Sequence, residues 1–164
     1  MAAADYFLKL DGITSESRDD KHKGEIEIAS FSWGESNAGT AGFGGGQGAG
    51  KVAAGDFTFV KRFDKASPQL FIACATGSHY KTGTLTVRKA GGGQQEYLKF
   101  NFEEVFISSY NVAGGGGGGT DSVPMDTFSI NFASLEVIYK EQKADGTLGG
   151  EAKQKYNFAE NKKI

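Results

Sequence analysis

The stretch that comes closest to a known chemical motif is Gly45-Gly-Gln-Gly-Ala-Gly-Lys51, whose spacing matches a phosphate-binding loop. In such a loop, backbone amides and the lysine hold the phosphates, a hydroxyl residue follows for the metal, and a helix begins there. Here Val52 stands where the hydroxyl belongs, and Gly55 would interrupt a helix three residues later. A chance match is expected in a chain with 25 glycines, so nucleotide binding through Lys51 has little support.

Two other groups of reactive side chains are poor candidates for catalysis. Cys74 and His79 are close in sequence, and a thiol beside an imidazole can act as a nucleophile. Cys74 lies in an apolar run, however, where a free cysteine packs as a small hydrophobic side chain and its thiolate is disfavoured. Glu103 and Glu104 are neighbours in a predicted strand and therefore point to opposite faces. One cysteine and two histidines give no metal-ligand spacing, so we expect no catalytic, cofactor or metal site.

The composition predicts one domain, residues 1–164, made in the cytoplasm. A length of 164 residues suits a single domain, and a net charge of −2 gives no electrostatic case for nucleic acid or an anionic membrane. No apolar run approaches the roughly 20 residues that span a bilayer. The N-terminus lacks the basic and apolar regions of a Sec signal peptide, and the single cysteine excludes an internal disulfide. Export by a route that reads no signal peptide remains open.

The longest pattern in the chain is a hairpin at about residues 96–140, with the glycine run 114–119 at its tip. Its arms, residues 96–110 and 125–139, are rich in aromatic and β-branched residues that alternate with period two, which predicts strands. Each arm is about three times as long as an ordinary strand of roughly five residues. The rest of the chain is therefore expected to be arranged around this hairpin.

The alternation shifts by one residue in the middle of both arms, past Glu103-Glu104 in the first and past Ala133-Ser134 in the second. Such a shift indicates a bulge, or a strand whose buried face switches. We expect a mainly β fold, a bent antiparallel β-barrel built from two sheets, with apolar surface left for another subunit. A sandwich whose strands bend between sheets fits the pattern equally well. The side chains expected to face a neighbouring subunit are Val105, Ile107, Leu135 and Val137.

Five shorter strands and one helix complete the expected fold. The helix covers about residues 67–76, with Ser67 as N-cap, Pro68 at the first position and Gly77 after its end. Because the helix is apolar nearly all round, we expect it to be buried and to plug one end of the barrel. The mixed-charge segment 13–24 is expected to be an exposed, solvated loop. The shorter strands are expected at residues 6–10, 25–33, 56–63, 81–89 and 151–158.

Residues 36–55 form a glycine-rich segment that is long for a connection inside a compact domain. A loop of this length usually has a function or lacks order. Its apolar residues Phe43 and Val52 provide points at which it could dock on another surface. We expect an extended loop at about 36–55 that contacts another molecule.

Six stretches along the chain, taken in order, are characteristic when read together. They are Glu16-Ser-Arg-Asp-Asp-Lys-His22, Phe31-Ser-Trp-Gly34, Gly48-Ala-Gly-Lys-Val52, Phe63-Asp-Lys-Ala-Ser-Pro-Gln-Leu70, Leu85-Thr-Val-Arg-Lys-Ala-Gly-Gly92 and Gln142-Lys-Ala-Asp-Gly146. In this order they resemble the haemolysin-coregulated protein (Hcp) family, the tube subunit of bacterial type VI secretion. The resemblance covers almost the whole chain, which makes it more specific than any single stretch. Ser15, where the family often has glycine, and the pure glycine run 114–119 are departures in loops.

The resemblance implies a bent β-barrel of two sheets with one helix, in a structural protein that performs no reaction. It implies rings of six copies that stack into a hollow tube inside a contractile sheath. Contraction expels the tube with a spike protein at its tip, and effector proteins ride in the lumen. The implied partners are thus other copies of the chain, the spike, the sheath and effectors, with no nucleic acid and no membrane insertion. Assembly in the bacterial cytoplasm and secretion through the type VI apparatus follow from the same resemblance.

On this interpretation the segment 36–55 is an arm that docks on the next ring or subunit, through Phe43, Gln47, Lys51 and Val52. Two other classes stay open from the residues alone. One is a monomeric ligand-binding β-barrel with an aromatic-lined cavity, and the other is an enzyme that acts through Lys51. A tube protein of a related contractile injection device would share the fold and is not separated by it.

Overall fold

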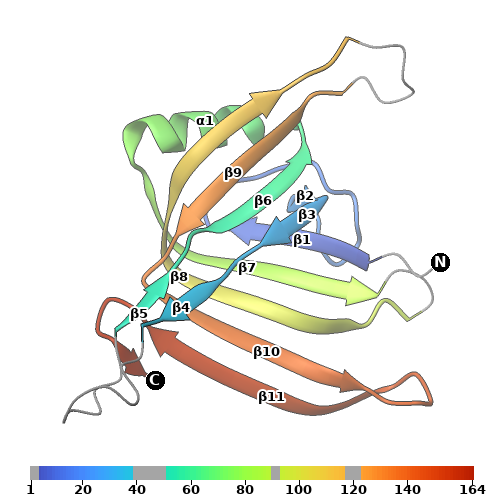
Figure 1. The fold of residues 1–164 in the computed structure, drawn as a ribbon. Helices are drawn as coiled ribbons and strands as arrows, with labels where there is room; N and C mark the ends of the chain where they lie inside the picture. The colour runs from blue at the N-terminus through green and yellow to red at the C-terminus, as the bar shows by residue number, and fades with distance from the viewer. Residues whose placement is uncertain (1–3, 39–50, 90–92, 117–122) are drawn as a thin grey trace.

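The structure, a computed structural model, describes residues 4–38, 51–89, 93–116 and 123–164. The protein is mainly β, with one short helix (Figure 1). The helix is α1 (Ser67–Thr76), and the strands within the described ranges are β1 (Ala4–Leu10), β2 (Ile26–Ile28), β3 (Ser30–Ser32), β4 (Glu35–Asn37), β5 (Val52–Ala54), β6 (Phe57–Arg62), β7 (His79–Lys89), β8 (Glu96–Ala113), β9 (Met125–Asn131), β10 (Ser134–Gln142), β11 (Leu148–Asn157) and β12 (Lys162–Lys163).

Ten of these strands form one antiparallel, strongly bent sheet, and β4 and β5 form a second, two-stranded sheet. The large sheet runs in the order β12-β11-β10-β8-β7-β1-β2, while β8 also pairs with β9, β9 with β6, and β6 with β3. Strands β2 and β3 are separated only by Ala29, whose amide donates to the carbonyl of Val60 at 2.8 Å. The sheet therefore curls round one core, as the expected bent barrel does (Figure 1). It is not closed by strand pairing, because β2 and β3 lie at two ends of the sheet and are joined through Ala29 without pairing with each other.

The expected change of buried face in the long strand β8 is confirmed at Glu104. Its backbone has φ of 52°, a left-handed conformation that is costly for a residue with a side chain. Phe102 and Val105, on either side of Glu103 and Glu104, are both buried, with 1% and 0% of their surface exposed. Because the strand turns its face here, residues 98–103 pair with β10 and residues 106–113 pair with β9.

The second arm of the hairpin is two strands, which corrects the expectation of one continuous arm. Strand β9 ends at Asn131 and β10 begins at Ser134. Between them the amide of Ala133 donates to the carbonyl of Glu103 at 2.9 Å, which places the break opposite the bend of β8. Similarly, the expected strand at 25–33 is divided into β2 and β3, and the seven expected strands become twelve within the described ranges.

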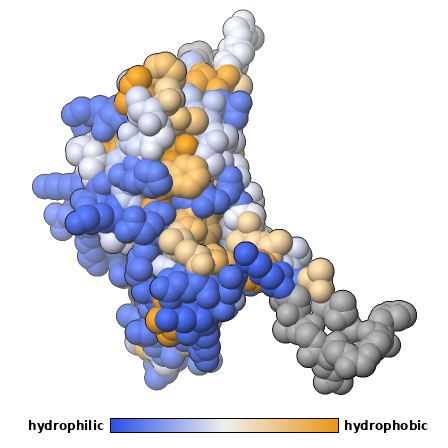
Figure 2. Space-filling model, turned by 90° about the vertical axis from the view of Figure 1, so that its left-hand side faces the viewer, coloured by the Kyte–Doolittle hydropathy of each residue, from blue (hydrophilic) through white to orange (hydrophobic). Residues whose placement is uncertain are grey.

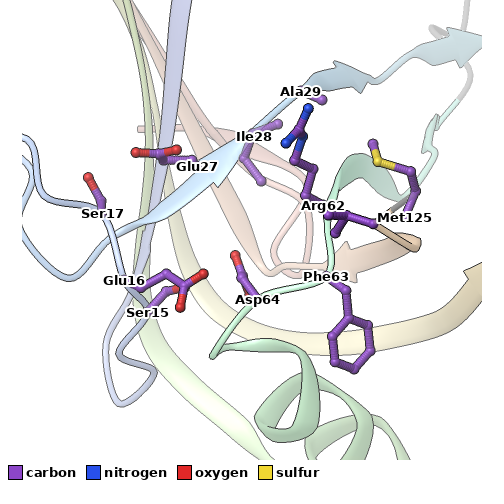
Figure 3. A pocket seen from close by; sticks show the side chains of 11 residues that line it. Ser15, Glu16, Ser17, Glu27, Ile28, Ala29, Arg62, Phe63, Asp64 and Met125 are labelled. Carbon is purple, nitrogen blue, oxygen red and sulfur yellow. The ribbon is translucent and has the colours of Figure 1, made fainter. Parts of the chain in front are cut away.

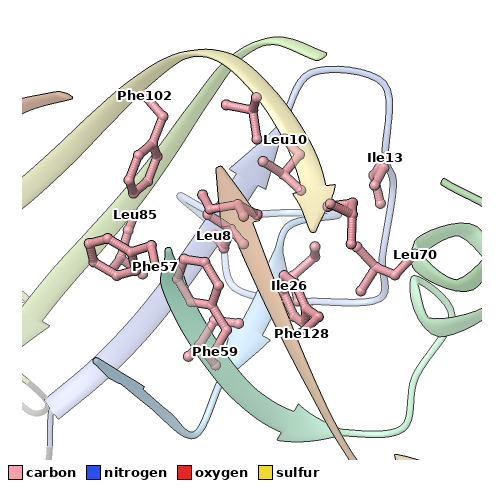
Figure 4. Packing of buried hydrophobic residues seen from close by; sticks show 14 of the residues in the cluster. Leu8, Leu10, Ile13, Ile26, Phe57, Phe59, Leu70, Leu85, Phe102 and Phe128 are labelled. Carbon is pink, nitrogen blue, oxygen red and sulfur yellow. The ribbon is translucent and has the colours of Figure 1, made fainter. Parts of the chain in front are cut away.

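Phenylalanine rings fill the centre of the core, as Figure 4 shows. The ring of Phe57 stacks on that of Phe59, and Phe59 stacks on Phe128, each with centroids 5.1 Å apart. Phe57 also meets the edge of Phe102 at 5.1 Å. All four side chains are at most 1% exposed, and burying each contributes about 2–3 kcal/mol relative to exposure.

The helix has the bounds that the sequence predicts, but it is not buried all round. Gly77 ends it in a left-handed conformation with φ of 66°. The N-cap is Ala66, with no side-chain cap, so the expectation of Ser67 as cap is wrong. One side of α1 contributes Leu70 to the core, whereas Phe71 on the other side is 57% exposed. The helix thus covers the core from one side and leaves an apolar face outside.

The segment 13–24 is packed against the sheet, contrary to the expectation of a solvated loop. Ile13, Ser15 and Ser17 alternate inward, and His22 is buried as well; all four are at most 8% exposed. The amide of Ser15 donates to the carbonyl of Gly24, and the amide of Gly24 donates to the carbonyl of Ser17, so the two ends of the segment are held together. No helix in the described ranges is long and apolar enough to cross a membrane.

Candidate assembly surfaces

The glycine-rich segment begins and ends in a short hairpin that projects from the barrel (Figure 1). Strands β4 and β5 pair antiparallel, with Glu35 opposite Ala54 and Asn37 opposite Val52. All three β4 residues are exposed, so this ribbon does not rest on the core. Its base is anchored because the indole Nε1 of Trp33 donates to the carbonyl of Gly55 at 2.9 Å.

The ring of Trp33 fixes this base to the core. It lies 6.3 Å from both Phe57 and Phe132, and 6.4 Å from Phe158, between ring centroids. Lys51 is exposed, and the strand β5, not a helix, follows it, so the context of a phosphate-binding loop is lacking at this point. Val52 is half-buried in β5, while Phe43 and Gln47 lie outside the described residues.

The four side chains expected to face a neighbouring subunit lie mostly inside the chain. Val105, Ile107 and Leu135 are 0%, 2% and 4% exposed and belong to the core cluster. Val137 is half-buried and packs against that cluster. The structure thus corrects the expectation for the first three. The bend in β8 turns both halves of that strand toward one core, and Leu135 of β10, which pairs with Phe102, packs in the same core. Only Val137 keeps surface that another subunit could cover.

The outward side of α1 is apolar and uncharged. Pro68, Phe71, Ile72 and Ala75, at the i, i+3, i+4 and i+7 spacing of one helix face, are all exposed. Phe71 and Ile72 are 57% and 54% exposed. Figure 2, which faces this side of the molecule, shows apolar surface at the end where α1 lies. Such a face is characteristic of a surface that another molecule covers.

A hollow of about 450 Å³ lies beside the N-terminal end of α1 (Figure 3). Three carboxylates line it, those of Glu16, Glu27 and Asp64, together with the guanidinium of Arg62. The remaining lining residues are Ser15, Ser17, Ile28, Ala29, Phe63, Val123 and Met125. The hollow therefore combines an acidic side with an apolar one.

A fully buried ion pair joins β6 to β9 below the helix. The ammonium of Lys61 lies 3.0 Å from Oδ2 of Asp126, and both side chains are 0% exposed. The same ammonium donates to Oδ1 of Asp64 at 2.8 Å and to Oγ of Ser67 at 2.7 Å. The hydroxyl of Tyr110 donates to Asp126 at 2.9 Å, and burial together with this bond raises the pKa of Tyr110 to about 12. These contacts explain why Ser67 is turned inward and does not cap the helix.

A second ionic cluster holds the segment 13–24 against the sheet. The guanidinium of Arg88, which is 3% exposed, forms a bidentate pair with Asp19 and a further bond to Asp5. The hydrogen bonds from Arg88 lower the pKa of Asp19 from 3.8 to about 2. The ring of Phe7 stacks on His22 at 4.4 Å and carries the Arg88 guanidinium 4.7 Å from its centroid.

The structure gives no support to catalysis by the reactive side chains of the sequence. Cys74 is half-buried and packs against the core, whereas His79 is exposed and lies against Phe106. Glu103 is paired with Lys155. No group of three or more metal-ligating side chains occurs in the part of the chain that the structure describes.

Comparison with known proteins agrees with the fold. The family model described as "Type VI secretion system effector, Hcp" matches residues 7–139. The chain belongs to the Hcp family. It is 44% identical to protein hcp1 of Pseudomonas aeruginosa over 161 residues, which are 97% of this chain and 98% of that protein. The Hcp family consists of secreted, structural type VI proteins and is not a family of enzymes.

Solved structures of Hcp proteins share the fold over the full length of the chain. The crystal structure of Hcp1 from Salmonella typhimurium is 35% identical and covers 100% of both chains, with a TM-score of 0.80. A structure of a type six secretion system protein is 32% identical with a TM-score of 0.91, and covers 99% of this chain and 100% of that one. The fold is therefore shared with these structures along nearly the whole chain.

Proposed function

We propose that the chain is the tube subunit of a type VI secretion system. Six copies form a ring, and rings stack into a hollow tube that a contracting sheath expels with a spike protein at its tip. Effector proteins travel in the lumen, and assembly takes place in the bacterial cytoplasm before secretion. The observation that carries the proposal is the similarity to an Hcp protein along 97% of the chain.

Two surfaces of the described chain support an assembled state. The outward face of α1 is apolar and uncharged, and the β4–β5 ribbon projects without resting on the core. Different faces that meet head to tail generate closed rings or open stacks. By contrast, the phenylalanines that fill the centre of the barrel occupy the space that a monomeric ligand-binding barrel would need.

The test of the proposal is the mass of the protein in solution. Light scattering on a sizing column, with electron microscopy of the same peak, should give annular particles of about six times 17.4 kDa. A chain that stays a monomer at every concentration up to about 1 mM would refute the proposed function, because it would leave the apolar face of α1 uncovered.

The projecting arm is proposed to contact the next ring, through Lys51 and Val52 at its base and Phe43 and Gln47 beyond. Deleting residues 42–50 should therefore leave single rings and shorten or abolish stacks. The number of rings per particle is counted in electron micrographs. Stacks of parental length in the deletion variant would show that the arm makes no contact that stacking requires.

A further inference from the structure

His22 is a buried, titratable side chain that none of the proposed assembly contacts uses. The residue is 6% exposed, and its ring lies between its own segment 13–24 and the first residue of β8. Its Nδ1 atom lies 2.9 Å from Oε2 of Glu25, and its Nε2 atom lies 2.7 Å from Oε1 of Glu96. Each ring nitrogen therefore faces a carboxylate oxygen at hydrogen-bond distance.

Two carboxylate partners require a proton on both ring nitrogens. An ionised carboxylate only accepts hydrogen bonds, and a neutral imidazole carries a proton on one nitrogen alone. With a neutral ring, a nitrogen lone pair would point at a carboxylate oxygen, unless a protonated carboxyl donated to it. Glu96 is not such a donor: burial raises its pKa, but the hydrogen bond from His22 and the ammonium of Lys99, 3.3 Å from its other oxygen, lower that pKa below 4.5.

The surroundings of the ring also favour a cation. Phe7 of β1 stacks on the ring with centroids 4.4 Å apart, and the face of an aromatic ring attracts positive charge. The pKa of Asp19 is lowered chiefly by the hydrogen bonds from Arg88 and in part by the charge of His22. Charged groups near the ring come from each element packed against it: Asp5 of β1, Asp19 and Lys21 of the segment, Glu25, Arg88 of β7, and Glu96 and Lys99 of β8.

The protonated ring joins two parts of the chain that are 74 residues apart. The backbone around His22 bonds to its own segment: its amide donates to the carbonyl of Asp19, and the amide of Glu25 donates to the carbonyl of His22, both at 3.2 Å. Among the described residues, the bond to Glu96 is the one polar link between residues 20–24 and a strand of the sheet. The charge of one ring therefore holds this part of the segment in place.

We propose that a protonated His22 latches the segment 13–24 to the start of β8, and that loss of this proton at higher pH loosens residues 20–24 from the sheet. Imidazole is the side chain whose charge ordinarily changes between about pH 5 and 8. The charged ring stabilises the closed segment at lower pH, and this contribution is lost as pH rises. Because the pKa of Glu96 is lowered, its carboxylate stays ionised from about pH 5 upward, so the ring causes the change. The latch lies within one chain and does not depend on assembly.

Tryptic cleavage measures the loosening, because Arg18, Lys21 and Lys23 are exposed trypsin sites within the segment. Each cleavage rate is divided by that of a synthetic peptide of residues 13–24 at the same pH, which removes the pH dependence of trypsin itself. Rates are measured between pH 6 and pH 9. Circular dichroism checks that each protein is folded, and light scattering checks that parent and variants have the same assembly state.

Three variants separate the charge of the ring from other effects. His22→Gln carries no charge at any of these pH values. In Glu96→Gln the side-chain amide can donate to the unprotonated nitrogen of a neutral ring, so both nitrogens keep a partner without the extra proton. His79→Gln, which removes the other histidine, an exposed one, is the matched control. It also leaves His22 as the single histidine, so nitrogen NMR of this variant reports the charge of that ring alone.

At pH 6 we expect His22→Gln to be cleaved on the order of tenfold faster than the parent, and at pH 9 the two should agree within about twofold. Glu96→Gln should stay closed at pH 9 and be cleaved on the order of tenfold more slowly than the parent there, while His79→Gln should match the parent throughout. The ring of His22 should become neutral over the same pH interval in which cleavage of the parent accelerates. A neutral ring at pH 6, a ring that becomes neutral with no rise in cleavage, or a rise in Glu96→Gln equal to that in the parent would each overturn the latch.

Discussion

The buried pair of Lys61 and Asp126 should be the most sensitive polar contact in the molecule. In the variant Lys61→Met a side chain of similar length removes the cation. The carboxylate of Asp126, which is 0% exposed, then keeps the hydroxyls of Ser67 at 2.6 Å and Tyr110 at 2.9 Å but has lost its counter-ion. Breaking a buried pair from one side costs about 3–5 kcal/mol. This would be a large part of the roughly 5–15 kcal/mol that stabilises a typical domain.

The assay is urea unfolding followed by the fluorescence of Trp33, the single tryptophan. Measurements at several protein concentrations separate unfolding from dissociation, since assembly makes apparent stability depend on concentration. The variant Lys61→Met with Asp126→Asn keeps an acceptor for the two hydroxyls and removes the unpaired charge, so it should regain at least half of the loss. Lys155→Met, which breaks the exposed pair with Glu103, is the control and should have little effect. A loss of less than about 1 kcal/mol in Lys61→Met would refute the reasoning.

Three other changes test separate features of the fold. Arg88 lowers the pKa of Asp19 from 3.8 to about 2, so this carboxylate stabilises the fold fully above about pH 4 and loses that effect as pH falls toward 2. Melting temperatures of Asp19→Asn should therefore vary less over this range than those of the parent, and parallel curves would contradict the role of the pair. Glu104→Gly removes a side chain from a left-handed backbone position, so in urea unfolding it should leave the free energy of unfolding unchanged or raise it by up to about 1 kcal/mol. Glu103→Gly, at the neighbouring position, should lower the free energy of unfolding by about 0.5–1 kcal/mol. Phe71→Ser should leave the unfolding of the dissociated chain nearly unchanged and weaken assembly by light scattering, and unaltered assembly would show that this face of α1 is not covered.

Local signals in the sequence predicted several elements correctly. The helix at 67–76 was marked by Pro68 at its start and Gly77 at its end, and both marks act within one turn of the backbone. The shift in alternation at Glu103-Glu104 correctly predicted a change of buried face, because period two identifies the residues that share a side of a strand. The ordered stretches along the chain likewise identified the Hcp family.

The same alternation did not predict which surface would remain open to another subunit. Val105, Ile107 and Leu135 were assigned to an interface and are core residues, since the direction in which a strand bends depends on its neighbours. The helix was expected to be buried because it is apolar, yet Phe71 is exposed, since the sheet covers only one side of α1. Apolar character predicts that a surface will be covered, but not whether the same chain or a second copy covers it.

The sequence by itself determined the helix, the change of buried face in β8 and the family, because each of these depends on residue types at short separations or on stretches in a fixed order. Only the tertiary structure decided the ionic clusters and the hollow beside α1. Lys61 meets Asp126 across 65 residues and Arg88 meets Asp19 across 69, and the hollow brings four separate segments of the chain together. Such contacts are made by the curling of the sheet, which depends on the register of many strand pairs at once and leaves no local pattern in the chain.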